Sequence, residues 1–157
     1  MAHVSQPPES VEVADTPNAI NGYISEAVWN VSIPTMTVFP PKGRNTGVAM
    51  IVFPGGGFKA VVVTLEGTEI CNWLTSKGIT CVLSKYRVPN GDTYGDAKYN
   101  CQITPKVPLA LQDAQRTIRL VRAGAKELNV DPKKIGVIGF SAGGYLVAQT
   151  SNIFAPT

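Results

Sequence analysis

Short apolar runs along the chain mark three predicted strands. They cover residues 48–53, 79–86 and 135–140, and turn-forming residues lie close to their ends. The first run, VAMIVF, is continuously apolar, which is typical of a strand that is covered on both faces. We expect the three runs to belong to one sheet.

Apolar residues at spacings of three and four predict the helices. A long helix is expected over 107–128, and a shorter one over 66–77 that ends before Gly78. A further helix is expected from Ala142 onward. The face expected to be buried on the long helix consists of Leu111, Ala114, Ile118, Val121, Ala125 and Leu128. The shorter helix places on one face Ile70, Trp73, Leu74 and Lys77. Alternating strands and helices predict an α/β fold with a parallel sheet and helices on its faces.

The remaining segments set the expected domain limits. Residues 1–27 are polar and rich in proline, and we interpret them as an extended, loosely held arm before a single domain over 28–157. Within 28–39, Pro34 predicts edge strands or a break between two short strands. The polar segment 87–106 is a long loop, and loops of this length are usually functional or disordered.

Composition and charge exclude several classes of protein. The chain has 157 residues and a formal net charge of +3, which gives no case for a nucleic-acid partner. No apolar run approaches the roughly 18 residues that a membrane-spanning helix needs. The N-terminus has neither the basic nor the apolar region of a signal peptide. Localisation therefore stays open between a secreted or periplasmic protein whose signal peptide was removed and a cytoplasmic one.

The cysteines and the single histidine argue against a metal site. Cys71, Cys81 and Cys101 are odd in number and widely spaced, which fits neither a disulfide framework nor a Cys-x-x-Cys site. The one histidine is His3, near the start of the chain. We expect no metal, and we expect Cys71 and Cys81 to be buried as small apolar residues.

A Gly-x-Ser-x-Gly sequence follows the last predicted strand and opens the last predicted helix. It runs from Gly139 to Gly143 and centres on Ser141. A serine on such a strand-to-helix turn stands clear of the backbone as a nucleophile, and larger side chains at the two glycines would collide with neighbouring backbone. The helix that begins at Ala142 directs amide groups toward developing negative charge. We therefore predict that Ser141 is a catalytic nucleophile.

A second glycine-rich segment, Pro-Gly-Gly-Gly-Phe, follows the first buried strand. It resembles in composition the HGGG-type loop that supplies backbone amides to an oxyanion hole, with Pro54 in place of the histidine. We predict that the oxyanion hole consists of the amides of Gly56, Gly57 and Ala142.

These segments together resemble a known family. FPGGGF, YRVP, ALQDAQRTIRLVR and IGVIGFSAGG are similar to α/β-hydrolase-fold serine esterases of the hormone-sensitive-lipase-like and acetyl-xylan-esterase-like branch. The resemblance covers roughly 28–157 and corresponds to the N-terminal half of that fold. It implies a three-layer, mostly parallel sheet truncated after the helix that follows the serine turn. It also implies hydrolysis of short acyl esters through an acyl-serine intermediate, with no cofactor and with acetylated carbohydrate as a substrate class.

The acid and histidine that complete such a site do not follow the serine. The family order is Ser, then Asp or Glu, then His, but residues 142–157 contain none of these three types. His3 precedes the serine and lies in the predicted arm. Truncation at this point also leaves the strand over 135–140 at an open sheet edge. We therefore expect a homo-oligomer or a missing C-terminal half, because apolar edges pair with a partner.

Three functions remain open from the sequence: a serine esterase, a half-domain without catalytic activity that serves binding or assembly, and a serine peptidase or acyltransferase. Phe58 and Tyr145 are candidates to line the substrate pocket, and the loop residues Tyr94 and Tyr99 are candidates to border it. Packing and loop anchoring explain these four aromatic residues equally well.

Overall fold

The computed structural model describes residues 9–13, 22, 24–88, 95–96, 101–102 and 107–153. The strands are β1 (Ser10–Val13), β2 (Glu26–Trp29), β3 (Thr35–Phe39), β4 (Ala49–Phe53), β5 (Ala60–Val62), β6 (Thr80–Lys85), β7 (Gly95–Asp96), β8 (Cys101–Gln102) and β9 (Ile135–Gly139). The helices are a π-helical turn η1 (Thr64–Thr68), α1 (Glu69–Ser76), α2 (Pro108–Ala123) and α3 (Ala142–Asn152).

The three apolar runs form neighbouring strands of one sheet, as predicted. The strand order is β3-β6-β4-β9, with parallel pairing of β4 to both β6 and β9 and antiparallel pairing of β3 to β6. The sheet is therefore mostly parallel, which confirms the predicted class. Among the described strands, β9 occupies one edge of this sheet and β3 the other.

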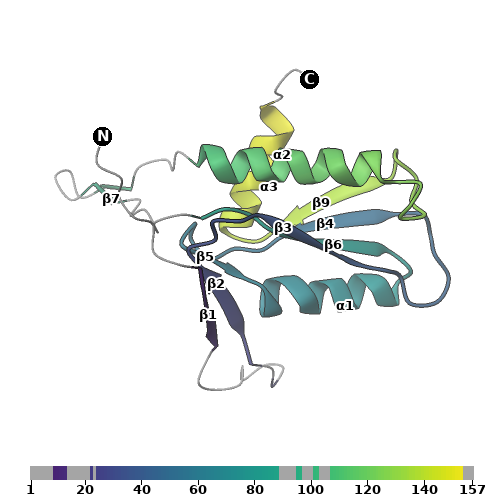
Figure 1. The fold of residues 1–157 in the computed structure, drawn as a ribbon, viewed down its shortest axis with the longest axis horizontal. Coiled ribbons are helices and arrows are strands. Elements are labelled where there is room, and N and C mark those ends of the chain that lie inside the picture. The colour runs from purple at the N-terminus through teal and green to yellow at the C-terminus, as the bar shows by residue number, and fades with distance from the viewer. Residues whose placement is uncertain are drawn as a thin grey trace.

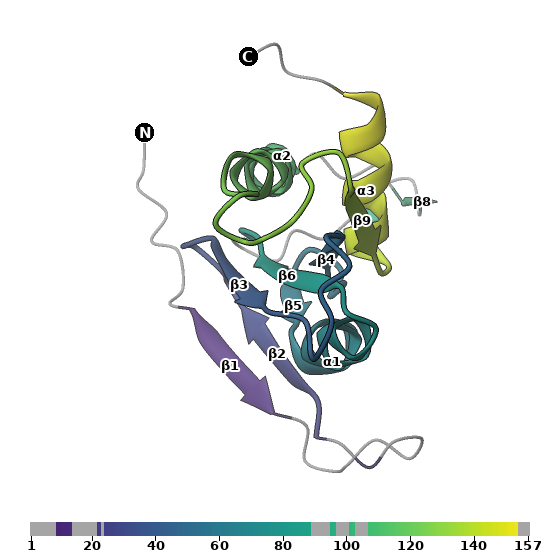
Figure 2. The ribbon, with the colours of Figure 1, turned by 90° about the vertical axis from the view of Figure 1, so that its right-hand side faces the viewer.

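Helices cover both faces of the sheet and make three layers. Figure 1 shows α1 on one side of the strands and α2 and α3 on the other, and Figure 2 shows the same layers end-on. The side chains of β4 alternate between the layers. Ala49, Ile51 and Phe53 belong to the core cluster with α2 and α3, whereas Val52 packs with α1.

A second, antiparallel sheet follows the order β1-β2-β5. Pro34 lies between β2 and β3, which belong to different sheets, so the predicted break between two short strands is confirmed. Part of the predicted arm is held by backbone pairing, because Ser10 to Val13 pair with Trp29 to Glu26. An ion pair between Glu9 and Lys85 also ties this region to the end of β6.

The prediction for the two cysteines is half wrong. Both are fully buried, as expected, but Cys71 and Cys81 form a disulfide between α1 and β6, with Cα atoms 5.2 Å apart. The spacing carried no disulfide signal because the chain folds back by a helix and a turn before the two positions meet. The face predicted for the shorter helix also differs. Of the predicted face, Leu74 is buried but Trp73 is 60% exposed, and the helix also buries Cys71 and Thr75.

The long helix is shorter than predicted and buries a charged residue. It ends at Ala123, and turns continue the chain to Asn129. Asp113, in the middle of α2, is only 4% exposed. It accepts hydrogen bonds from the Arg87 backbone N–H (2.9 Å), Nε (2.8 Å) and Nη2 (2.6 Å). These contacts explain how a carboxylate can be buried here, because a buried carboxylate requires a partner of opposite charge.

The same contacts act on the charge of Arg87. The hydrogen bond with Asp113, and secondarily its negative charge, raise the pKa of the Arg87 guanidinium above its ordinary value despite some burial. A raised pKa stabilises the fold at every pH below the ordinary value and loses its effect only in strongly alkaline solution. The pair therefore fixes the start of the segment after β6 throughout the neutral range.

Candidate functional site

The register of two parallel strands brings the serine turn and the glycine loop together. Phe53 pairs with Gly139 at the carboxyl ends of β4 and β9. The glycine loop starts one residue after Phe53, and the serine turn starts directly after Gly139. In open α/β sheets, ligands bind at the carboxyl ends of the strands. The two segments predicted from the sequence therefore meet where such sites occur.

The backbone at Ser141 has the strained geometry expected for a nucleophile turn. Its φ is 47° and its ψ is −114°, a combination that non-glycine residues rarely adopt, and the residue is exposed. A Cβ on Gly139 would collide with the Gly143 carbonyl, and a Cβ on Gly143 would collide with the Phe53 carbonyl. The predicted steric reason for both glycines is confirmed.

Hydrogen bonds fix the peptide planes of the glycine loop. The Gly55 carbonyl accepts a bond from the Val62 N–H at 3.0 Å, and the Gly56 carbonyl accepts bonds from the N–H groups of Lys59 and Ala60, each at 3.0 Å. In a trans peptide, the N–H of the next residue points opposite to the carbonyl. The amides of Gly56 and Gly57 consequently point away from the segment that leads into β5.

These amides have hydrogen-bonding capacity to spare. Among the residues that the structure describes, none accepts a hydrogen bond from the N–H of Gly56, Gly57 or Ala142. Gly56 has a φ of 131°, and a Cβ there would collide with the Ala60 carbonyl, so the loop shape requires glycine at this position. Ala142 begins α3, where the helix dipole favours negative charge.

The glycine loop touches the serine turn directly. A Cβ built on Gly55 would lie 3.0 Å from Ser141 Cβ and 2.8 Å from both the Phe140 carbonyl oxygen and Glu66 Oε2. Glu66 Oε2 also accepts a hydrogen bond from the Gly55 N–H at 2.6 Å. Sequence reasoning missed Glu66, because a single acidic residue in η1 belongs to no motif.

The two aromatic residues proposed for the pocket pack against each other. The rings of Phe58 and Tyr145 meet edge to face, with centroids 5.8 Å apart, and Phe58 also meets Tyr86 at 6.3 Å. Phe58 is buried and Tyr145 is half-buried. Tyr145 of α3 therefore packs against the last residue of the Pro-Gly-Gly-Gly-Phe segment. The other candidates, Tyr94, Tyr99 and His3, lie outside the described residues.

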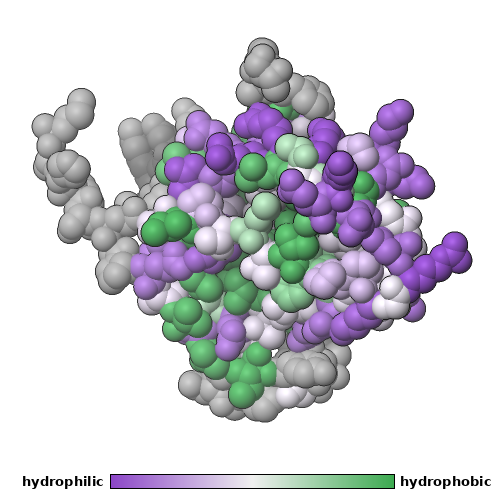
Figure 3. Space-filling view, turned by 45° about the vertical axis from the view of Figure 1, so that its right-hand side comes forward, coloured by the Kyte–Doolittle hydropathy of each residue, from purple (hydrophilic) through white to green (hydrophobic). Residues whose placement is uncertain are grey.

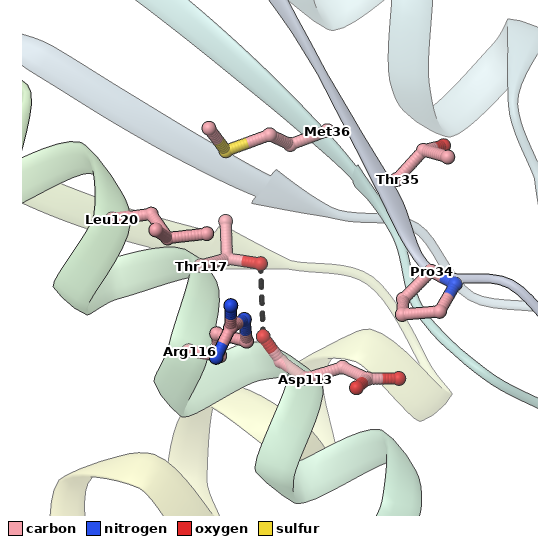
Figure 4. A pocket seen from close by; sticks show the side chains of 7 residues that line it. All are labelled: Pro34, Thr35, Met36, Asp113, Arg116, Thr117 and Leu120. Atoms are coloured by element: carbon pink, nitrogen blue, oxygen red, sulfur yellow. Dashed lines mark hydrogen bonds between the residues drawn. The ribbon is translucent and has the colours of Figure 1, made fainter.

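A pocket of about 160 Å³ lies away from Ser141, between β3 and α2. Figure 4 shows its lining residues, which come from these two elements and from Pro34 just before β3. Asp113 and Thr117 both contribute to it, and the Thr117 hydroxyl donates to the Asp113 carbonyl at 2.9 Å. Because β3 and β9 form opposite edges of the sheet, this pocket is separate from the serine turn.

The described part of the chain shows neither a membrane-spanning helix nor a cluster of metal ligands. None of its helices is long and apolar enough to cross a membrane. In the same residues, no group of three or more His, Cys, Asp or Glu side chains is placed to hold a metal ion.

Comparison with known protein families and sequences identifies relatives. The BD-FAE family profile matches residues 37–152. The chain is 33% identical over 118 residues to an acetylxylan esterase of Xylanibacter ruminicola, covering 75% of this chain and 22% of that protein. It is 30% identical over 119 residues to an arylesterase of Saccharolobus solfataricus, covering 76% of this chain and 34% of that protein. The chain thus spans between about a fifth and a third of these relatives.

Solved structures agree with the sequence comparison. An acetyl ester-xyloside bifunctional hydrolase from Caldicellulosiruptor lactoaceticus has a TM-score of 0.52 and 34% identity, covering 85% of this chain and 41% of that one. Esterase Est2 of Thermogutta terrifontis with bound propionate has a TM-score of 0.56 and 27% identity, covering 89% of this chain and 44% of that one. The resemblance inferred from the sequence motifs is confirmed: the chain belongs to the BD-FAE family of α/β-hydrolase esterases.

Proposed function

We propose that this chain carries the nucleophile and oxyanion hole of a serine carboxylic-ester hydrolase that acts on short acyl esters. The observation that carries the proposal is the exposed, strained Ser141 in contact with a loop whose amides are oriented and unused. The relatives named as an acetylxylan esterase and an acetyl ester-xyloside hydrolase favour acetylated carbohydrate as the substrate class.

The proposed reaction follows from this geometry. Ser141 Oγ attacks the ester carbonyl carbon, and the carbonyl oxygen becomes an oxyanion that accepts hydrogen bonds from Gly56, Gly57 and Ala142. The C–O bond to the alcohol then breaks, which leaves an acyl group on Ser141, and water releases the acid in a second attack. Preorganised donors of this kind act mainly on the transition state, in which the negative charge develops.

The proton of the serine hydroxyl requires a general base. Residues 142–157 contain no Asp, Glu or His, so we propose that a segment or subunit beyond these 157 residues supplies the acid and the histidine. Without a base, an oxyanion hole and binding alone retain a residual rate of about 10³–10⁴-fold over water. We expect the isolated chain to act slowly.

A fluorophosphonate probe tests the nucleophile. We expect slow covalent labelling of the folded chain at Ser141, assisted by the oxyanion donors alone, and we expect Ser141→Ala to abolish it, because the probe forms its covalent bond with the hydroxyl beside these donors. Intact-protein mass spectrometry followed by peptide mapping measures the labelled site. Ser151→Ala is the matched control, since Ser151 is exposed on α3 and its hydroxyl donates only to the Val147 carbonyl.

Other outcomes of this experiment favour the other functions. A folded chain that the probe does not label would support a half-domain that serves binding or assembly. Faster turnover of an amide than of the matching acetyl ester would support a peptidase, and acyl transfer to an added alcohol would support an acyltransferase.

The open edge of β9 leads to a proposal about partners. Its five residues are half-buried, and β4 is its one neighbour among the described strands. Large apolar side chains are also exposed at the opposite edge of the sheet, namely Ile33 and Met36 at β3 and Leu120 on α2, and Figure 3 shows apolar surface in the middle and lower part of one face. We propose that the chain pairs with a second copy or with a C-terminal half of the same fold.

Light scattering over a dilution series measures this association. We expect a mass above that of a monomer at micromolar concentration, because open apolar strand edges pair with other chains. If a C-terminal half is the natural partner, adding that half as a separate chain should replace the self-associated species with a complex of the two halves. A soluble monomer at every concentration would contradict the proposal.

A further inference from the structure

Two side chains hold the peptide that begins the glycine loop, one at each end. The Gly55 N–H donates to Glu66 Oε2 at 2.6 Å, and the Tyr86 hydroxyl donates to the Pro54 carbonyl at 2.5 Å. In a trans peptide, the carbonyl and the N–H point in opposite directions. The two bonds together therefore prevent rotation of the Pro54–Gly55 peptide plane.

The two side chains come from parts of the structure that are themselves fixed. Tyr86 follows β6 and is fully buried. Glu66 lies in η1, which leads directly into α1, and the disulfide between Cys71 and Cys81 attaches α1 to β6. Tyr86 and Glu66, which hold the peptide, are therefore both attached to β6 of the central sheet.

The carboxylate of Glu66 stands close to the proposed reaction centre. Glu66 Oε2, the Phe140 carbonyl oxygen and Ser141 Cβ all lie within 3.0 Å of the same point beside Gly55. A negative charge at this place opposes the formation of an oxyanion nearby. Glu66 therefore favours the reaction through the hydrogen bond that it accepts, whereas its negative charge disfavours the oxyanion.

We propose that Glu66 and Tyr86 are positioning residues that hold the glycine loop in the orientation in which the amides of Gly56 and Gly57 face the substrate oxygen. The inference rests on the proposed function, because it assigns a purpose to the orientation of these amides. The Pro54–Gly55 peptide is the first of the loop. The next two peptides are held by backbone hydrogen bonds to the Gly55 and Gly56 carbonyls, and fixing the first peptide supports them.

The rate of fluorophosphonate labelling tests this role. We expect Glu66→Ala and Tyr86→Phe to slow labelling by about 10- to 100-fold, the range for lost supporting contacts and oxyanion donors. Glu66→Gln keeps an acceptor oxygen and removes the charge, so its rate should stay within about fivefold of the unaltered chain. Glu127, exposed just beyond α2, provides the control substitutions Glu127→Ala and Glu127→Gln, which should change nothing.

Rescue by glutamine separates positioning from the alternatives. Equal losses in Glu66→Ala and Glu66→Gln would show that the charge matters and would overturn the proposal. Thermal unfolding of each variant identifies a loss of labelling that merely follows a loss of fold. A labelling rate unchanged in both Glu66→Ala and Tyr86→Phe would also overturn it.

A second measurement is independent of any activity. Amide hydrogen exchange, followed by NMR, should be at least about tenfold faster at Gly55 in Glu66→Ala than in Glu66→Gln, because the amide loses its acceptor. The amide resonances of Gly56 and Gly57 should shift in Glu66→Ala and Tyr86→Phe. If the probe does not label the unaltered chain but the variants show these changes in exchange and resonances, the proposed function is wrong while the positioning role of the two residues is supported. Unchanged exchange and resonances would refute the positioning role itself.

Discussion

Replacing Gly143 with alanine is expected to destabilise the fold by at least about 3 kcal/mol, because the new methyl group would overlap backbone that cannot move aside. A Cβ at this position collides with the Phe53 carbonyl and lies 2.7 Å from the Pro54 carbonyl oxygen. Phe53 O already accepts a hydrogen bond from the Phe140 N–H at 3.1 Å, so its movement would disturb the junction of β4 and β9. Urea unfolding followed by circular dichroism measures the loss.

The next residue offers a matched control. A Cβ on Gly144 would lie 3.4 Å from the Gly139 carbonyl oxygen, which is a tight but tolerable contact. Alanine is a better helix former than glycine by up to about 1 kcal/mol, so Gly144→Ala should leave stability within about 1 kcal/mol. Equal stability of the two variants would contradict the packing described for the serine turn.

Removing the disulfide should lower the free energy of unfolding by about 2–3 kcal/mol, since the bridge closes a loop of modest length. Cys71 and Cys81 are 10 positions apart and fully buried, so Cys71→Ala with Cys81→Ala removes the bridge without leaving buried polar groups. Urea unfolding with and without a reductant measures the effect. The double variant should be insensitive to the reductant, whereas the unaltered chain should lose stability when it is reduced.

Cys101→Ala is the control for this experiment, because it leaves the bridge between α1 and β6 in place. Alkylation of Cys71 and Cys81 in the denatured, unreduced chain would show that the disulfide does not form. Disulfides persist mainly in oxidising compartments, so the bridge favours the secreted or periplasmic alternative over the cytoplasmic one.

Local patterns in the sequence predicted the sheet, the helices and the serine turn. The apolar run over 48–53 and the Gly-x-Ser-x-Gly turn each depend on neighbouring residues, and the structure shows β4 and an exposed Ser141 at these places. The family membership followed from the same segments. Roles for Ser141, Gly56, Gly57 and Ala142 in catalysis remain predictions that the labelling experiments test.

Features that depend on contacts between distant segments were missed. Asp113 is buried because Arg87, which follows β6, donates hydrogen bonds to it, and Trp73 is exposed because α1 turns Cys71 and Leu74 toward the sheet. Glu66 and Tyr86 converge on one peptide from opposite sides of the glycine loop. Neither residue belongs to a spacing rule, since their partners are backbone atoms that any sequence provides.

The pairing of β4 with β9 also bears on how the chain reaches its folded state. Ala49 pairs with Ile135, so this half of the sheet requires closure of a very long loop, whereas β4, α1 and β6 are close in sequence. Closing long loops is slow, and contacts between distant residues delay folding. During synthesis, one edge of β4 therefore stays unpaired until β9 emerges, and aggregation competes with folding during that interval.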